Sequence, residues 1–247
     1  MVKLIMSGVC IIPSGMKNLK GLKAVIFDFG GTLDLDGIHW LNAFYILYEE
    51  LSLLVNKPAI KKVFYEVDGH LEKLPDRQKL TLEPMLWTHI NLQFKLHGFN
   101  APQKEKEMFE KFCSMVRQNF ERNVPLLKEL KSKYKLGLVS NFYGNVAILC
   151  NEAGFAPFLD VIIDSDEVGL RKPDPEIFKL ALSRLNVQPA EAVFVGDSFN
   201  RDIKPAKSIG MKTIWLKTEH TAPFLDNWKE FVDVEISTLS ELKEILL

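Results

Sequence analysis

The chain has few cysteines and no long apolar run. Cys10, Cys113 and Cys150 form an odd set without C-x-x-C spacing, which argues against both a disulfide framework and a zinc site. The apolar runs fall far short of the ~18 residues that a membrane-spanning helix needs. We therefore expect a cytoplasmic protein with no membrane segment.

The chain also lacks an excess of charge of either sign. Its 31 Lys and Arg residues stand against 32 Asp and Glu residues, which leaves a net charge of -1. The phosphate backbone of nucleic acid binds to proteins with an excess of positive charge. Because this chain has no such excess, we do not expect nucleic acid as a partner. A chain of this length buries roughly 70 to 75% of the surface that its unfolded form exposes, so it needs no disulfide or structural metal to fold. We expect a monomer or a homodimer.

The first 20 residues stand apart from the rest as an N-terminal extension. The apolar run between Lys3 and Pro13 is similar to a short secretory segment, but Pro13 ends it and no small-residue cleavage site follows. We therefore do not expect export. A poorly ordered extension and a true start at Met16 both remain open.

Short apolar runs that end in polar residues predict strands buried on both faces. The runs are residues 24–27, 136–139, 161–163, 192–195 and 211–216. Between them Pro125 and Pro175 predict helix starts, Gly154 and Gly210 predict helix ends, and Ser237 or Thr238 predicts the cap of a last helix. Strands that alternate with helices predict an α/β fold with a parallel sheet.

Residues 36–122 interrupt this alternation with helical periodicity alone. We predict three or four helices there, with breaks near Pro58, Pro75 and Pro102. We expect these helices to form a second domain over the carboxyl edge of the sheet. The domain that contains the sheet would comprise residues 21–35 and 123–247. An apolar stripe, and three large aromatic residues, are expected in the helical core: Leu82, Met85, Leu86, Ile90 and Phe94, with Trp40, Tyr45 and Trp87.

Ligands of a parallel sheet bind at the carboxyl ends of its strands, where the polar residues of this chain should meet. Asp28 and Asp197 would place two carboxylates together there, which calls for a cation or a shared proton. Mg²⁺ suits such a site because it takes oxygen ligands and substrate phosphate. Ser140, Asn141 and Lys172 would supply donors to a phosphoryl group.

Four segments of the chain resemble the motifs of the haloacid dehalogenase superfamily. In order they are Asp28-Phe29-Gly30-Gly31-Thr32-Leu33, then Ser140-Asn141, then Lys172-Pro173, then Gly196-Asp197-Ser198 with Asp202. The resemblance covers residues 23 to 217 and implies a Rossmann-like three-layer core. The position of the helical insertion resembles that of the helical-cap type, subfamily I or C1.

The resemblance implies a role for each motif residue. Asp28 would attack phosphorus to form an aspartyl-phosphate, and Ser140 and Lys172 would grip the transferring group as the other catalytic residues. Phe29, through its backbone amide, Gly31 and Asn141 would bind substrate, which would be a small phosphorylated metabolite. Mg²⁺ would be held by Asp28, the Gly30 carbonyl and Asp197, with Asp202 binding the waters of the metal.

Gly30 departs from the pattern of the phosphatases. These relatives carry a second aspartate two residues after the nucleophile, which protonates the leaving group and then activates water. Loss of a general acid and base costs ~10²- to 10⁴-fold in rate. Asp34 and Asp36 follow closely, but the turn after Thr32 is expected to direct them toward the cap, so we do not expect them to replace the missing acid.

Three functions remain open at this point. The first is a Mg²⁺-dependent phosphatase that is slow or specialised. The second is a family branch that lacks the second aspartate, either a dehalogenase, against which Gly196-Asp197 counts, or a phosphonate hydrolase using Lys57, Lys61 or Lys62. The third is a non-catalytic protein that binds a phosphometabolite or a partner. The five histidines, His39, His70, His89, His97 and His220, are expected on the surface or in the core.

Overall fold

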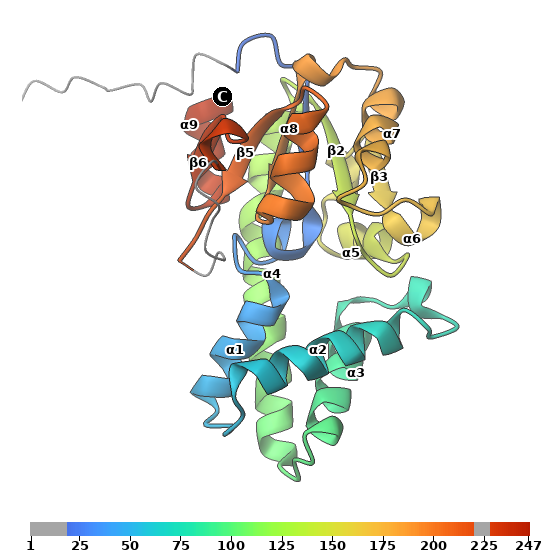
Figure 1. Cartoon of the computed structure of the whole chain (residues 1–247), viewed down its shortest axis with the longest axis vertical. Helices are drawn as coiled ribbons and strands as arrows, with labels where there is room; N and C mark the ends of the chain where they lie inside the picture. Colours follow the sequence, from blue (N-terminus) through green and yellow to red (C-terminus); the bar gives the residue numbers. More distant parts are fainter. Residues whose placement is uncertain (1–18, 220–227) are drawn as a thin grey trace, which may run out of the picture.

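The computed structural model describes residues 19–219 and 228–247, and its central element is a sheet of six parallel strands in the order β3-β2-β1-β4-β5-β6 (Figure 1). The strands are β1 (Ala24–Phe27), β2 (Lys135–Ser140), β3 (Val161–Asp164), β4 (Ala192–Gly196), β5 (Lys212–Leu216) and β6 (Val234–Ile236). The predicted parallel α/β fold is confirmed, and the short β6 was missed. The predictions for residues 1–18, with Cys10, and for His220 lie outside the described residues.

The sheet is buried on both faces because side chains alternate along each strand. Val25 and Phe27 of β1 join the apolar core beneath α4 (Pro102–Lys131), α5 (Val146–Glu152) and α9 (Leu242–Leu246), whereas Ala24 and Ile26 join the core beneath α7 (Pro175–Leu185) and α8 (Lys204–Ser208). The core therefore has three layers, helix on sheet on helix. The helices that follow the second strand are α5 (Val146–Glu152), α6 (Ser165–Val168), α7 (Pro175–Leu185), α8 (Lys204–Ser208) and α9 (Leu242–Leu246).

Four helices lie between β1 and β2: the first three pack together beyond the carboxyl edge of the sheet, and the fourth packs on them and continues along one face of the sheet (Figure 1). They are α1 (Trp40–Glu50), α2 (Lys57–Leu71), α3 (Leu82–Leu96) and α4 (Pro102–Lys131). Asn56 caps α2 by accepting a hydrogen bond from the Ala59 N–H at 2.9 Å. The predicted apolar stripe of α3 is buried and belongs to the same core cluster as Phe27, so the cap and the sheet share one apolar interior.

Helix α4 corrects one prediction and crosses a predicted boundary. Pro125 does not start a helix, because α4 runs through it without a break from Pro102 to Lys131. Its buried side chains, among them Phe120 and Leu127, continue on one face through the proline, so packing outweighs the lost backbone bond. The proposed boundary between residues 122 and 123 falls inside this helix.

The helical core holds most of its expected aromatic residues but not all. Trp40 is buried and Tyr45 is half-buried, whereas Trp87 is 41% exposed and was wrongly predicted to be core. Trp87 packs on the ring of Phe109 at the surface of the cap, with ring centroids 5.4 Å apart. Helical periodicity predicts which face of a helix a residue lies on, but residues at the edge of the apolar face, such as Trp87, remain partly exposed.

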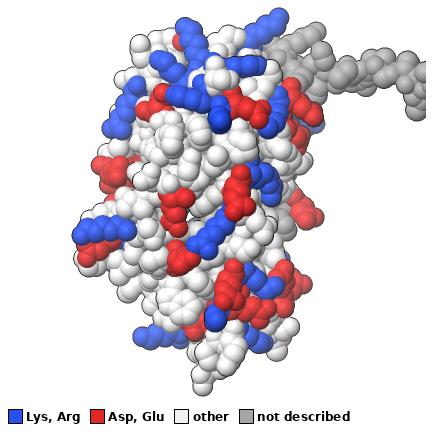
Figure 2. All heavy atoms as spheres, turned by 180° about the vertical axis from the view of Figure 1, so that it is seen from behind, with Lys and Arg blue, Asp and Glu red and all other residues white. Residues whose placement is uncertain are grey.

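The absence of long apolar runs, the balanced charge and the few cysteines seen in the sequence each have a counterpart in the structure. None of the helices in the described ranges combines the length and apolarity needed to cross a membrane. Acidic and basic side chains are interspersed on the face shown in Figure 2. Cys113 and Cys150 are buried free cysteines, and burial raises the pKa of their thiols to about 11 and about 12.

Replacing Pro125 with alanine should stabilise the protein. Pro125 has no N–H to donate to the carbonyl of Glu121, and alanine restores that bond, so Pro125→Ala should raise the free energy of unfolding by about 1–3 kcal/mol. Urea denaturation measures the change. Pro102→Ala is the matched control, because Pro102 is the first residue of α4 and its N–H would have no helical partner. Equal effects of the two substitutions would contradict the account.

Candidate active site

Strand register brings the polar strand ends together at one edge of the sheet. Phe27 pairs with Leu138 of β2 and with Val195 of β4, so Asp28, Ser140 and Asp197 leave the sheet at the same edge. Between this edge and the helical cap lies a cleft of about 730 Å³, part of it open to solvent. Its lining includes Asp28, Gly30, Ser140, Asn141, Lys172 and Asp202 from the core, and Phe64 and Asp68 of α2 with the C-cap residue Glu72.

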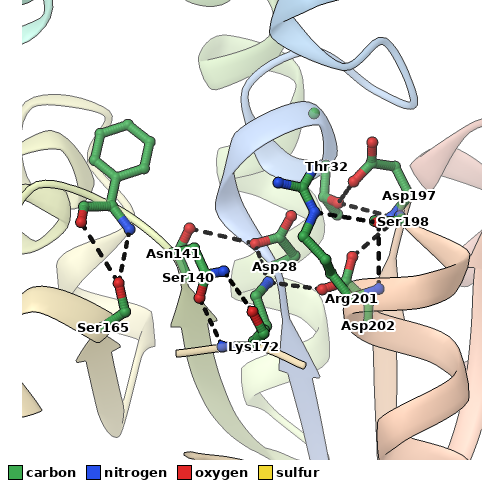
Figure 3. A network of polar contacts seen from close by, with 12 residues as sticks. Asp28, Thr32, Ser140, Asn141, Ser165, Lys172, Asp197, Ser198, Arg201 and Asp202 are labelled. Carbon is green, nitrogen blue, oxygen red and sulfur yellow. Dashed lines mark hydrogen bonds and ion pairs between the residues drawn. The ribbon is translucent and has the colours of Figure 1, made fainter. Parts of the chain in front are cut away.

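Lys172 links two carboxylates at the floor of the cleft (Figure 3). Its Nζ lies 2.6 Å from Asp28 Oδ1 and 2.7 Å from Asp202 Oδ1; the first contact is a hydrogen bond, whereas the second is an ion pair without hydrogen-bond alignment. Burial alone would lower the pKa of Lys172, but the charges of Asp202 and Asp28 outweigh it and raise the pKa above its usual value. Ser140 Oγ also donates to Asp28 Oδ1, at 3.3 Å.

Three carboxylates share this buried site with a single lysine. Asp28, Asp197 and Asp202 are 5%, 8% and 0% exposed, and each offers an oxygen within 4.8 Å of the other two. Burial raises the pKa of Asp197 well above its usual value, and the charges of Asp28 and Asp202 add to the effect. The charges of Lys172 and Arg201 together do not balance three carboxylates, so the residues present fit a bound divalent cation with oxygen ligands.

Two glycines allow the carboxylates to approach the backbone. A Cβ on Gly31, whose φ is +88°, would lie 2.7 Å from Asp197 Oδ2. A Cβ on Gly196 would lie 2.7 Å from Asp202 Oδ2. Side chains at these positions would therefore displace the acids that the sequence predicts as metal ligands.

Asn141 and Gly31, both predicted to bind substrate, make hydrogen bonds within the protein. The Asn141 amide donates to the Lys172 carbonyl and accepts from the Lys172 N–H, both at 2.8 Å, so it holds the lysine backbone in place. The Gly31 N–H donates to Asp34 Oδ1 at 2.6 Å. The third predicted residue, Phe29, has a buried ring that packs edge-on against Phe142. Direct contact of these three with substrate stays a prediction.

The polar end of β3 does not reach the cleft. Asp164 accepts hydrogen bonds from the N–H groups of Gly144, Val146 and Asp166, at 2.9, 3.1 and 3.0 Å. Ser165 Oγ accepts from the Phe142 N–H at 3.2 Å. The expectation that every polar strand end converges on one site was therefore wrong for β3, whose acid instead fixes the loop after β2.

Asp34 and Asp36 are both committed to structural contacts. Asp34 is fully buried and accepts from the Gly31 N–H and from Trp40 Nε1, each at 2.6 Å. Asp36 accepts from Arg122, the Thr238 hydroxyl and the Leu239 N–H. Neither lines the cleft. The turn was expected to direct both acids toward the cap, which is wrong for Asp36, because it contacts Thr238 and Leu239 of the sheet domain. That neither acid replaces the missing one stays a prediction.

Gly30 lines the cleft beside the nucleophile position and has ordinary backbone angles. Its φ of -73° and ψ of 113° are open to any L-residue. A Cβ there would meet only Phe142 Cε2, at 3.8 Å, which is ordinary contact. The space that an aspartate would need is therefore present, and an aromatic ring borders it.

His39 and Arg201 are cleft residues that the sequence interpretation missed. His39 caps α1 and lies with Nε2 2.8 Å from Arg201 Nη2, although the histidines were expected to be surface or core residues. Burial, helped by the charge of Arg201, lowers the pKa of His39 to about 4. Arg201 precedes Asp202 in the fourth motif, which was the available signal, whereas nothing near His39 in sequence marks it. His89 is a buried core residue as expected.

The buried carboxyl of Asp34 should make stability depend on pH. Burial raises its pKa to about 7 from 3.8, against the opposing hydrogen bonds of Trp40 and Gly31. The folded protein therefore binds the proton of the Asp34 carboxyl more tightly than the unfolded chain does. The stability that the protonated carboxyl contributes is lost as pH rises through 7. The stability of the wild type relative to Asp34→Asn should fall by about 2–3 kcal/mol between pH 5 and pH 8 in urea denaturation. Parallel pH curves for the two proteins would contradict this.

Known proteins share both the sequence and the fold of this chain. A stretch of 89 residues is 44% identical to glyceraldehyde 3-phosphate phosphatase of Pyrococcus furiosus and covers 36% of this chain and 37% of that protein. The matched stretches span 37 to 58% of the length of three such phosphatases, less than two thirds of each.

Solved structures extend the likeness over nearly the whole chain. A HAD phosphatase from Thermococcus onnurineus is 30% identical with a TM-score of 0.53, covering 91% of this chain and 98% of that one. The hydrolase YfnB of Bacillus subtilis, solved bound to magnesium, shares the fold with a TM-score of 0.55 at 21% identity, over 92% of this chain and 99% of that one. Residues 22–210, which include Asp28, Lys172 and Asp202, match the haloacid dehalogenase-like hydrolases, and the chain belongs to that family of enzymes.

Proposed function

We propose that this hydrolase is a Mg²⁺-dependent phosphatase of small phosphorylated metabolites that works through an aspartyl-phosphate on Asp28. The observation that carries the proposal is the convergence of Lys172 Nζ and Ser140 Oγ on Asp28 Oδ1 inside the cleft, at 2.6 and 3.3 Å. A nucleophilic carboxylate needs cationic and hydroxyl donors beside it to bind an anionic phosphoryl group. The helical insertion after β1 supports the helical-cap type, with the cap over the cleft.

The residues of the chain suffice for a two-step transfer. A carboxylate oxygen of Asp28 attacks phosphorus, the bond from phosphorus to the leaving-group oxygen breaks, and an aspartyl-phosphate forms. Lys172 and Ser140 donate to the phosphoryl oxygens and offset their charge. Water then attacks phosphorus and gives its proton to solvent, the bond to Asp28 breaks, and phosphate is released. Because Gly30 holds no acid, the leaving oxygen takes its proton from solvent.

A metal would be held by the acidic cluster at the same edge of the sheet. Asp28, Asp197 and the Gly30 carbonyl are the proposed ligands, and Asp202 is the proposed partner of the metal-bound waters. Mg²⁺, when bound, supplies positive charge against the carboxylates and the phosphoryl oxygens. The excess of buried carboxylate over Lys172 supports this assignment.

The other hydrolase branches find less support. Lys57, Lys61 and Lys62, the candidate amines of a phosphonate hydrolase, are exposed and do not line the cleft. Asp197 is buried beside Asp28, as a metal site needs and a metal-free dehalogenase does not. A non-catalytic binding protein is the remaining alternative, and turnover measurements decide it.

Restoring the missing acid should change which esters the enzyme hydrolyses. The wild type should favour aryl and acyl phosphates over alkyl phosphates, because a poor alkoxide leaving group needs a proton in the transition state. Gly30→Asp, which the backbone angles and the open space allow, should raise kcat/KM for alkyl phosphates by about 10²-fold or more and change aryl phosphate turnover much less. Gly30→Ala, which adds a Cβ without an acid, is the control.

The alkyl to aryl ratio of kcat/KM at saturating Mg²⁺ is the measurement. An unchanged ratio in folded Gly30→Asp would mean that another group already supplies the proton. Absence of turnover in the wild type and in both variants would favour the binding-protein alternative.

Mg²⁺ should stabilise the folded protein through Asp197. At about 100 times its dissociation constant the ion adds about 2.7 kcal/mol to the free energy of unfolding, which appears as a rise in Tm. Asp197→Asn should abolish the rise, while the surface change Asp76→Asn should keep it. Differential scanning calorimetry with and without Mg²⁺ measures the effect, and an equal rise in Asp197→Asn would refute the metal assignment.

A further inference from the structure

One stripe of α2 forms the cap wall of the cleft. Phe64 and Asp68 of this helix and its C-cap residue Glu72 are spaced four residues apart, so they follow one face, and all three line the cleft together with Tyr65. Asp28, Ser140 and Lys172 line it from the core. A phosphate ester bound at Asp28 would therefore direct its leaving group toward the wall that carries Asp68.

Asp68 is held in place by one hydrogen bond, from Tyr143, and the His89 ring lies beside the same oxygen without a hydrogen bond to it. The Tyr143 hydroxyl donates to Asp68 Oδ1 at 2.6 Å. His89 Nε2 lies 3.4 Å from that same oxygen. Asp68 Oδ2 has no hydrogen bond with any residue in the described ranges, and the side chain keeps 27% of its surface exposed.

A buried chain of polar groups sets the proton position on His89. The Tyr48 hydroxyl donates to Gln93 Oε1 at 3.2 Å, so the Gln93 amide nitrogen faces His89 Nδ1, 2.9 Å away, as a donor. Nδ1 then accepts, and the ring proton lies on Nε2, toward Asp68. Asp68 therefore accepts a hydrogen bond from the Tyr143 hydroxyl and faces the N–H edge of His89, which is the arrangement for a carboxylate that accepts rather than for an acid that gives up a proton.

Asp68 has no cationic partner within the part of the chain that the structure describes. No Lys or Arg there lies within 4 Å of it, whereas the neighbouring Glu72 is paired with Arg171 at 2.8 Å. The rings of Phe64, Tyr65 and Tyr143 also line the cleft. A carboxylate with an open oxygen beside aromatic rings is the combination that binds an ammonium group, through an ion pair and cation–π attraction.

We infer that the leaving group of the preferred substrate carries an ammonium group, which Asp68 binds. The substrate class is then a phosphate ester of a short amino alcohol. This inference rests on the proposed function, because Asp28 must hold the phosphoryl end. Esters with a second anionic group are disfavoured by the same unpaired carboxylate.

Paired substrates and a matched variant test the inference. Aminoalkyl phosphates of two to four carbons are compared with alkyl phosphates of equal length, with 2-carboxyethyl phosphate and with an aryl phosphate. In the wild type kcat/KM for the best aminoalkyl ester should exceed that of its alkyl counterpart by about 10-fold or more. Asp68→Asn should remove most of this preference, read as the ratio of kcat/KM for the two esters within the variant. Glu66→Gln, an equal charge loss on α2 outside the cleft, should keep it.

Binding gives a second readout that does not need turnover. Calorimetry in the Asp28→Asn background should show tighter binding of the aminoalkyl ester than of the alkyl ester, by about the same factor, and Asp68→Asn should remove the difference. Equal kcat/KM or equal Kd for the two esters, or a preference for the carboxylated ester, would overturn the inference. If the aryl phosphate is hydrolysed in that case, the phosphatase proposal survives. If no ester is hydrolysed but the ammonium preference in binding is present, the phosphatase proposal fails and the ammonium site stands.

Discussion

The ammonium group of Lys172 between Asp28 and Asp202 is the contact on which the site depends. Three buried carboxylates would repel one another without it, and a buried charge that loses its partner costs several kcal/mol. Neighbouring residues hold Lys172 and Asp202 in the positions that this contact requires. Asn141 fixes the Lys172 backbone, and Gly196 lets Asp202 approach closely.

The shared apolar interior gives the site its second wall. Because the cap helices and one face of the sheet belong to the same core cluster, α2 is held over the strand ends. The hydrogen bond from Tyr143 to Asp68 and the ion pair of Arg171 with Glu72 join the two parts at the cleft. Under the two proposals, chemistry at Asp28 and selection of the leaving group at Asp68 are separate tasks of the core and the cap. Gly30 would make the leaving group matter more, since no acid beside the proposed nucleophile assists its departure.

Much of the core could be predicted from local sequence patterns, because apolar runs with polar ends are both a strand signal and a site signal. The same patterns failed where distant contacts decide the outcome. Pro125 stays helical because a long buried face supports α4, and Asp164 turns into the loop after β2 instead of the cleft. The pairing of Tyr143 with Asp68 joins residues 75 positions apart, and His39 meets Arg201 across 162 positions. Neither pair has a local signal, so sequence alone shows the phosphoryl end of the site and not the leaving-group end.

The central claim is that Asp28 carries the phosphoryl group while Lys172 and Ser140 bind its oxygens. A crystal structure grown with Mg²⁺ and beryllium fluoride tests it most directly, because the fluoride adduct mimics an aspartyl-phosphate. The account predicts the adduct on an Asp28 oxygen, with Lys172 Nζ and Ser140 Oγ within hydrogen-bond distance of its fluorines and Mg²⁺ beside Asp197. An adduct on any other residue, or one on Asp28 that neither Lys172 nor Ser140 touches, would contradict it.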